Sequence, residues 1–309
     1  MTNDVTPGSQ AVGSSINPPT NKLTTWISNI ISDLGKNGIF IALIVVVVFF
    51  SITTNGILLR PQNISNLIVQ NGYILVLAIG MVMVIIAGHI DLSVGSVAAF
   101  IGAISGVFAV KMGLPWWLSI ILSLLIGALV GAWQGFWVAF VGIPAFIVTL
   151  AGMLIFRGLA LVVLGNANIG SFPEEYRALG NGFTKNWFFT DAAIDPLTLA
   201  VAAIALIAFV VQQVRTRNAR VKYEQHVDPL PWFITKLVLV IAAIGFFAYA
   251  LASYKGIPVT LIVLAVLVLV YGIVMARSVF GRHIYAIGGN RHAAELSGVK
   301  ARRVDFFLF

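Results

Sequence analysis

The sequence predicts an all-α polytopic membrane protein, a transmembrane helix bundle with eight complete spans and the start of a ninth. Of its 309 residues, 59% are hydrophobic and only 10% are charged, whereas about a quarter of an ordinary soluble domain is charged. So few charges cannot cover the surface of a soluble protein of this size. The apolar residues also form runs long enough to cross a hydrocarbon core of about 30 Å, which takes about 20 helical residues. Lipid is therefore the expected solvent for most of the chain.

Composition excludes several classes of site. The chain has no cysteine, which rules out disulfides, thiolate metal sites and cysteine nucleophiles. Its four histidines are scattered without metal-ligand spacing, so neither a metal nor a cofactor is predicted. The net charge of +8 is spread over short segments between apolar runs. That distribution indicates membrane orientation and argues against nucleic-acid binding, which needs a basic face on a folded domain.

Residues 1–37 are predicted to be a polar cytoplasmic tail and lead-in, disordered where Ser, Thr, Asn, Pro and Gly dominate. The transmembrane domain is expected over 38–309. Gly142-Ile143-Pro144 divides a long uncharged stretch into two spans, because proline lacks an amide hydrogen and disfavours helix just before it. A ninth run begins at Val304, and we expect the chain to be a fragment cut within it. The eight spans are predicted at 38–54, 64–87, 92–110, 114–141, 145–165, 196–214, 232–253 and 257–276.

Basic residues set the direction of the spans. With the N-terminus in the cytoplasm, the inner segments hold twelve Lys and Arg and the outer segments hold five, as expected when cytoplasmic loops carry the positive charge. Loops 215–231 and 277–303 are then cytoplasmic, and loop 166–194 lies outside. The inner residues are Lys22, Lys36, Arg215, Arg217, Arg220, Lys222, Arg277, Arg282, Arg291, Lys300, Arg302 and Arg303. The outer residues are Arg60, Lys111, Arg177, Lys185 and Lys255.

Small and polar residues inside spans mark where helices touch each other or a ligand. Gly127, Gly131 and Gly135 recur at steps of four, which places them on one helix face and predicts close packing of a neighbouring backbone. Gln134 lies on the adjoining face, where its amide is free to serve either packing or a ligand.

Other polar residues occur near span ends. Gln70 and Asn71 lie near the outer end of the second span. Asp91 stands at the start of the third, where its carboxylate is predicted to cap the helix; a gating or coupling role is the alternative. Arg157 is expected to pair with an acid of the following loop, such as Glu174, Glu175 or Asp191; the alternative is that its side chain extends outward to the membrane surface.

Three blocks of this sequence resemble, in the same order, the sugar ABC permeases of the ribose and xylose type. They are 88–96 (GHIDLSVGS), 144–153 (PAFIVTLAGM) and 281–290 (GRHIYAIGGN), and the similarity runs from about residue 38 to the end. Asn168-Ile169-Gly170 and the long segment after Arg215 are most similar to the xylose and multiple-monosaccharide permeases. The family's last spans have no counterpart here.

The resemblance implies the membrane-spanning permease subunit of a binding-protein-dependent ABC importer, which carries xylose or a related monosaccharide across the bacterial inner membrane. The implied partners are a second permease subunit in a homodimer, a cytoplasmic ATP-binding subunit and a periplasmic sugar-binding protein. The chain has no G-x-x-x-x-G-K-[ST] loop, so it is not expected to be an enzyme. The alternative is a proton-coupled secondary transporter, which normally needs intramembrane carboxylates; Asp91 alone qualifies.

The resemblance also implies where this importer is coupled to its ATPase. A short helix is predicted from Asn290 to Ser297, because Asn290 suits an N-cap and Gly298 a C′ position, and the family uses such a helix for coupling. The alternative is a basic loop resting on anionic lipid. The coupling residues are expected to be Gly289, Asn290, Arg291, Ala293, Ala294, Leu296, Ser297 and Gly298.

Two further functional sites are predicted. The aromatic and acidic residues of loop 166–194 are expected either to receive the periplasmic sugar-binding protein or simply to cap the bundle. From their polar side chains within or near spans, the translocation path is expected to include Gln70, Asn71, Asp91, Ser93 and Gln134. For Gln70 and Asn71 the alternative is that they are ordinary interfacial residues.

Overall fold

The computed structural model describes residues 38–39, 42–165, 167–184, 193–225, 227 and 229–309. This part of the chain is helical, which confirms the predicted fold class of an all-α multi-pass membrane protein. Seven of the described helices are long and apolar enough to cross a membrane. They are α2 (Pro61–Ile86), α3 with the π-helical turn η2 (Val94–Lys111), α4 with the π-helical turn η3 (Trp116–Val141), α5 (Ala145–Leu164), α8 (Pro196–Lys222), α9 (Leu230–Ala252) and α10 (Val259–Arg277).

The predicted count of eight spans is wrong by one. Where the first span was predicted, the described apolar helix is Ala42–Thr53, residues 38–39 are also helical, and residues 40–41 lie outside the described part of the chain. The predicted tail, 1–37, lies outside the described residues. Residues 1–59 form a unit of their own, separate from the unit 60–309, and all that follows concerns the second unit.

The other seven predicted spans each coincide with one observed helix, within a few residues at most ends. The largest difference is at α8, which continues to Lys222 instead of ending at residue 214. The extra residues include Arg220 and Lys222 in the last turn. Basic side chains are good helix formers and are favoured at the negative end of the helix dipole, so this segment extends the helix beyond the apolar run.

Proline residues set where many of these helices begin. Four of the long helices have a proline at the N-cap position, with φ between −51° and −61°. These residues are Pro115, Pro144, Pro229 and Pro258. The ring fixes φ and supplies no amide hydrogen, which suits a residue just before a helix. Gly142 ends the preceding helix with φ of +83°, so the predicted break between the fourth and fifth spans is confirmed.

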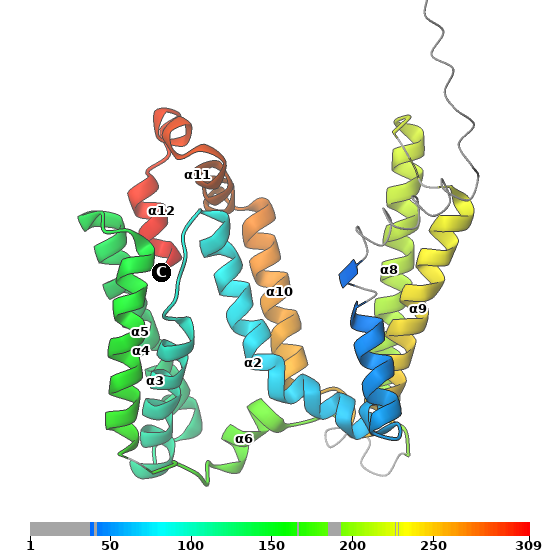
Figure 1. The fold of residues 1–309 in the computed structure, drawn as a ribbon, viewed down its shortest axis with the longest axis horizontal. Helices are drawn as coiled ribbons and strands as arrows, with labels where there is room; N and C mark the ends of the chain where they lie inside the picture. The colour runs from blue at the N-terminus through cyan, green and yellow to red at the C-terminus, as the bar shows by residue number, and fades with distance from the viewer. Residues whose placement is uncertain (1–37, 40–41, 166, 185–192, 226, 228) are drawn as a thin grey trace, which may run out of the picture. The chain divides into compact units, whose positions relative to one another are not determined.

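Within the unit, α3 packs along α5 and also against α4, while α2 packs against α10 and α9, and α8 lies against α9. Three shorter helices complete it: α6 (Glu174–Asn181), α11 (Val279–Leu296) and α12 (Ala301–Leu308). Figure 1 shows α11 and α12 at one end of the bundle, beside the end of α2, and α6 at the opposite end. Helix α12 packs on α11, α4 and η3.

The outer loop lies over its end of the bundle. Tyr176 of α6 contacts the hydroxyl of Ser105 on α3, and the side chains of Ile169 and Phe172 approach Gly106 at 3.1–3.3 Å from its ideal Cβ position. Thr184 also pairs with Ile257, at the start of α10, through two hydrogen bonds of 3.0 Å. The described part of this loop therefore caps α3 and α10.

The connection between α2 and α3 is not helical. After α2 ends at Ile86, residues 87–93 run away from the α11 end of the bundle to the start of α3, which lies inside the bundle (Figure 1). Gly88 makes the turn with φ of +84°, a conformation that glycine adopts without strain. Helix α3 is therefore short, and non-helical backbone lies beside α4 and α5.

Two of the three glycines predicted on one face of α4 meet α12. A Cβ at Gly131 would collide with the carbonyl oxygen of Phe309, and one at Gly135 would lie 2.8 Å from the carbonyl oxygen of Phe306. Gly127 has no neighbour within 4 Å of its ideal Cβ. The end of α12 thus approaches the α4 backbone at the second and third glycines only.

Replacing Gly135 with alanine should weaken this packing, because the new methyl group would push against the backbone of α12. Overpacking typically costs about 1–3 kcal/mol, so the thermal midpoint of the detergent-solubilised protein should fall by several degrees. Gly127→Ala is the matched control on the same helix and should leave the midpoint unchanged or raise it, since alanine is the better helix former. Equal losses in the two variants would contradict the packing described here.

Candidate functional site

Helix α11 is two helices joined at a break. Asn290 has φ of −158° and ψ of 104°, which is extended backbone inside an otherwise helical run. Its side-chain oxygen accepts a hydrogen bond of 3.0 Å from the amide of Ala293, the contact that an N-cap residue makes with the third residue of its helix. The predicted N-cap is confirmed, and we call the helical segment that follows it, 291–296, the short helix.

The other end of the short helix is closed by Gly298. Its φ is +87°, and its amide donates to Glu295 while the amide of Val299 donates to Ala294. These two hydrogen bonds form a Schellman motif, for which glycine is favoured because the position is left-handed. The predicted C′ glycine is confirmed as well.

The short helix presents most of its surface outward. Ala294 is buried in an apolar cluster with Ala301 and Val304 of α12, whereas Arg291, Ala293 and Ser297 are exposed. Leu296 is 78% exposed, which is high for a large apolar side chain on a helix of fixed geometry. The coupling residues expected from the sequence therefore form one compact element with a free outer face.

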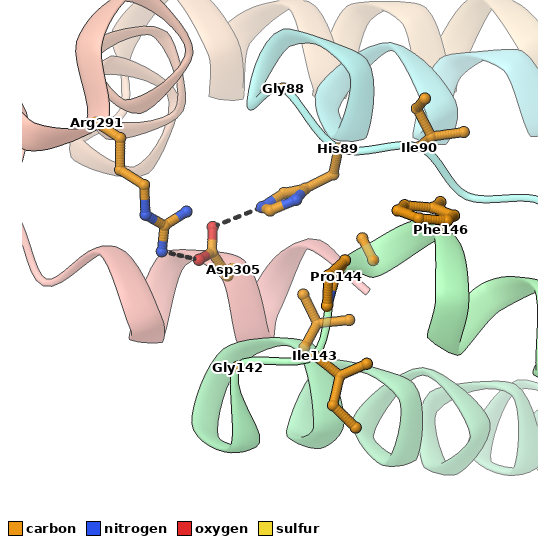
Figure 2. A pocket seen from close by; sticks show the side chains of 11 residues that line it. Gly88, His89, Ile90, Gly142, Ile143, Pro144, Phe146, Arg291 and Asp305 are labelled. Carbon is orange, nitrogen blue, oxygen red and sulfur yellow. Dashed lines mark hydrogen bonds and ion pairs between the residues drawn. The ribbon is translucent and has the colours of Figure 1, made fainter.

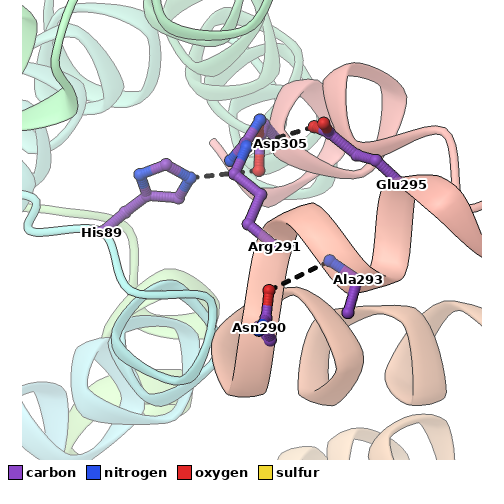
Figure 3. A network of polar contacts seen from close by, with 6 residues as sticks. All are labelled: His89, Asn290, Arg291, Ala293, Glu295 and Asp305. Carbon is purple, nitrogen blue, oxygen red and sulfur yellow. Dashed lines mark hydrogen bonds and ion pairs between the residues drawn. The ribbon is translucent and has the colours of Figure 1, made fainter.

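Asp305 joins the short helix to two other segments (Figure 3). Its side chain on α12 is almost fully buried. One carboxylate oxygen, Oδ2, accepts from Nη2 of Arg291 at 2.5 Å, and the other, Oδ1, lies 3.0 Å from Nε2 of His89. The hydrogen bond to Asp305 raises the pKa of Arg291 above its ordinary value. A buried carboxylate needs such partners, because an unpaired charge would be costly to desolvate.

A pocket of about 430 Å³ opens beside these three side chains (Figure 2). His89, Arg291 and Asp305 form its polar side. The rest of its wall is apolar and comes largely from the turn between η3 and α5. Those residues are Val138, Gly142, Ile143, Pro144, Ala145 and Phe146.

A second polar cluster holds the start of α3. Asp91 Oδ1 accepts from both the amide and the hydroxyl of Ser93, each at 2.7 Å. Ser93 Oγ in turn accepts from Nε2 of Gln134 at 2.9 Å. Asp91 was predicted to be the N-cap of this helix and is not: the cap position is Ser93, and the carboxylate instead closes a turn two residues ahead of the helix.

Thr149 of α5 satisfies the backbone of the same segment. Its hydroxyl accepts from the amide of Leu92 at 3.1 Å and lies 3.3 Å from the carbonyl oxygen of Ile90. Gly152, one turn further along α5, leaves room for the Gln134 amide, because a Cβ there would lie 2.6 Å from its Nε2. We call Asp91, Ser93, Gln134 and Thr149 the α3 anchor.

The structure thus brings together three of the five residues expected in the translocation path. Asp91, Ser93 and Gln134 belong to the anchor, and Gln134 is 3% exposed with its amide bound to Ser93. Gln70 and Asn71 lie apart from it on α2, where both are exposed. The Asn71 side chain donates to the carbonyl of Leu67 at 2.8 Å.

Arg157 does not make the expected ion pair within the described residues. Its side chain is exposed, and no ion pair links it to Glu174 or Glu175, which are described. Asp191, the third candidate partner, lies outside the described residues.

Sequence reasoning missed His89, Thr149 and Asp305. His89 and Thr149 lie within the blocks 88–96 and 144–153, which carry the family resemblance, but the sequence predicted no role for either. Asp305 is an acid inside the apolar run that begins at Val304, and a charge in such a run needs a partner. That signal was present in the sequence, although it does not say which partner is used.

Comparison with known proteins gives a consistent result. Residues 63–309 match the family described as branched-chain amino acid transport system / permease component. No solved structure matches the chain.

Several curated relatives are sugar permeases. The chain is 36% identical over 269 residues to the xylose transport system permease protein XylH of Haemophilus influenzae, covering 87% of this chain and 69% of that protein. It is 34% identical to XylH of Escherichia coli K12, covering 87% and 66%, and 31% identical to the ribose import permease protein RbsC of Bacillus subtilis, covering 89% and 63%. The chain therefore spans about two thirds of the length of these relatives.

Removing the Gln134 amide should destabilise the protein, because the buried hydroxyl of Ser93 loses a partner. An unsatisfied buried polar group costs about 1–3 kcal/mol, so Gln134→Leu should lower the thermal midpoint. In a Ser93→Ala background the same substitution should cost less, since the partner has already gone. Strictly additive effects in this double-mutant cycle would show that the two side chains do not interact.

Proposed function

The chain belongs to the family of branched-chain amino acid transport system permease components, and on that premise we propose that it is the membrane-spanning permease subunit of a binding-protein-dependent ABC importer for xylose or a related monosaccharide. The observation that carries the proposal is the similarity to two xylose permeases over 87% of the chain. Seven apolar spans and an outward-facing short helix support it. ATP hydrolysis then takes place on a separate subunit.

In this proposal the short helix is the contact with the ATPase. Its ends are fixed by Asn290 and Gly298. Arg291 and Ala294 hold it against α12. The exposed Leu296 offers an apolar side chain to a groove on the partner. An amphipathic helix that lays such a side chain into a groove is a common mode of protein recognition.

The orientation in the membrane follows from charge. The basic ends of α8 and α10, at Lys222 and Arg277, lie on the same side as the short helix when successive spans alternate in direction. Cytoplasmic loops carry the excess of Lys and Arg. We therefore place the short helix in the cytoplasm and α6 on the periplasmic side of the inner membrane. The predicted cytoplasmic N-terminus requires in addition that the apolar segment 38–54 crosses the membrane, as the sequence predicts.

The remaining assignments concern the sugar and its delivery. Gln70 and Asn71, exposed on α2, are proposed to face the path between this subunit and a second copy in a homodimer. Asp91, Ser93 and Gln134 contribute by fixing the start of α3. The outer loop, which caps α3 and α10, is proposed to meet the periplasmic sugar-binding protein.

The absence of native cysteines allows a direct test of orientation. A Leu296→Cys variant would carry a single thiol on the exposed face of the short helix, and Lys255→Cys would carry one at the opposite end. In intact cells, a membrane-impermeant maleimide should label the second variant only. In inverted vesicles it should label the first. Labelling of the Leu296→Cys variant from outside the cell would contradict the orientation.

Transport itself should be measured in sealed proteoliposomes that contain the permease and its ATPase partner, with xylose-loaded binding protein on the periplasmic face. Uptake of labelled xylose should require ATP and should survive collapse of the proton gradient by a protonophore. Liposomes without the ATPase are the control. Uptake that persists in the control, or that is lost when only the proton gradient is removed, would favour a secondary transporter and contradict the proposal of an ABC importer.

A further inference from the structure

We infer that Asp305 and His89 are positioning residues for the coupling step, and that they transmit displacement of the short helix to the start of α3. The inference rests on the proposed function and deepens it, because it assigns a route between the ATPase contact and the membrane-embedded part of the chain. The route consists of Arg291, Asp305, His89 and the α3 anchor, in that order. Neither Asp305 nor His89 touches the partner or the sugar in this scheme.

The first step depends on the break in α11. The part of α11 before Asn290 is held firmly, because a Cβ at Gly288 would collide with the carbonyl oxygen of Ile86 and the side chains of Ile284 and Ile287 are buried. The extended backbone at Asn290 separates this fixed part from the short helix. A push on the short helix can therefore be absorbed at Asn290, without moving the first part of α11.

The second step carries the displacement into α12. Arg291 is bonded to Asp305, and Ala294 packs against Ala301 and Val304. Both contacts join the short helix to α12, one by charge and one by apolar packing. The carboxylate of Asp305 is almost completely buried, so it cannot exchange Arg291 for water at little cost. Short helix and α12 are thus expected to move as one body.

The third step leads from α12 to the segment 87–93. His89, near the start of that segment, lies 3.0 Å from Asp305 and its ring approaches that of Phe309 at 5.9 Å between centroids. The far end of the segment is tied to α4 and α5 by Ser93 and Leu92. Only two residues, Ile90 and Asp91, separate His89 from the anchored Leu92, and an extended residue spans at most about 3.6 Å. Displacement of His89 must therefore act on the start of α3.

The pocket beside His89, Arg291 and Asp305 provides space for this movement. It is open on one side of His89, Arg291 and Asp305, and the turn 142–146 forms the opposite wall (Figure 2). Closely packed side chains transmit strain but shift very little. Side chains that border a pocket of about 430 Å³ can shift without first displacing packed neighbours.

The test separates transmission from simple structural support. In the proteoliposome assay, xylose transported per ATP hydrolysed should fall about tenfold for Asp305→Asn, the effect of losing roughly one charge-assisted hydrogen bond, while ATP hydrolysis continues. The matched control is Asp195→Asn, because Asp195 is also a buried aspartate but caps α8 through Thr198. That control should keep the wild-type ratio, even if its thermal midpoint falls.

A second pair of variants keeps the test decisive if Asp305→Asn does not assemble. His89→Ala should lower the ratio in the same way, and His89→Gln, which retains a side-chain donor, should restore most of it. An unchanged ratio in His89→Ala, or losses of ATP hydrolysis and uptake in equal proportion, would overturn the inference. Wild-type liposomes that show no ATP-dependent uptake would instead refute the proposed function.

Discussion

Backbone groups that are buried away from water must be paired within the protein, and the non-helical segment 87–93 is where this constraint shapes the fold most. A helix satisfies its own amides and carbonyls, but an extended segment beside other spans does not, and each unpaired group there would cost several kcal/mol. Thr149 pairs with the backbone of Leu92 and lies close to that of Ile90, while Asp91 pairs with that of Ser93. The position of α5 follows from this constraint, because Thr149 supplies partners for the segment, and α4 adds Gln134 as a partner for the Ser93 side chain.

The two ends of this segment are held by different chemistry. At the membrane-embedded end, the Asp91 carboxylate binds Ser93, Ser93 binds Gln134, and Thr149 binds the backbone of the same segment, so the contacts are many and individually modest. At the other end a single buried carboxylate, Asp305, is shared by two nitrogen donors. Removing one member of such a pair strands a buried charge, which is far more costly than losing a neutral hydrogen bond. The first end is therefore suited to anchoring, and the second to transmission.

The parts of the structure that sequence could predict are those governed by local rules. The break at Gly142 and Pro144 and the caps at Asn290 and Gly298 each depend on the conformational preference of one residue, and all were predicted at the correct position. Asp91 was misplaced by two residues because a carboxylate can close a turn as readily as it caps a helix. The pairing of His89 with Asp305 joins residues 216 apart in the chain. No local pattern specifies such a contact, since it arises only once α12 has packed against α4.

The proposed transmission requires α11 to be anchored at one end and movable at the other, and the break at Asn290 permits both. Gly288 lies directly on the end of α2, at Ile86, and the segment 87–93 begins at the next residue. A continuous α11 would tie the short helix rigidly to α2, and the short helix could then not move relative to His89. With the backbone extended at Asn290, the short helix can turn about that residue while α2 stays in place. In the proposed route, the displacement of Asp305 is then taken up by the segment 87–93, between the fixed end of α2 and the start of α3.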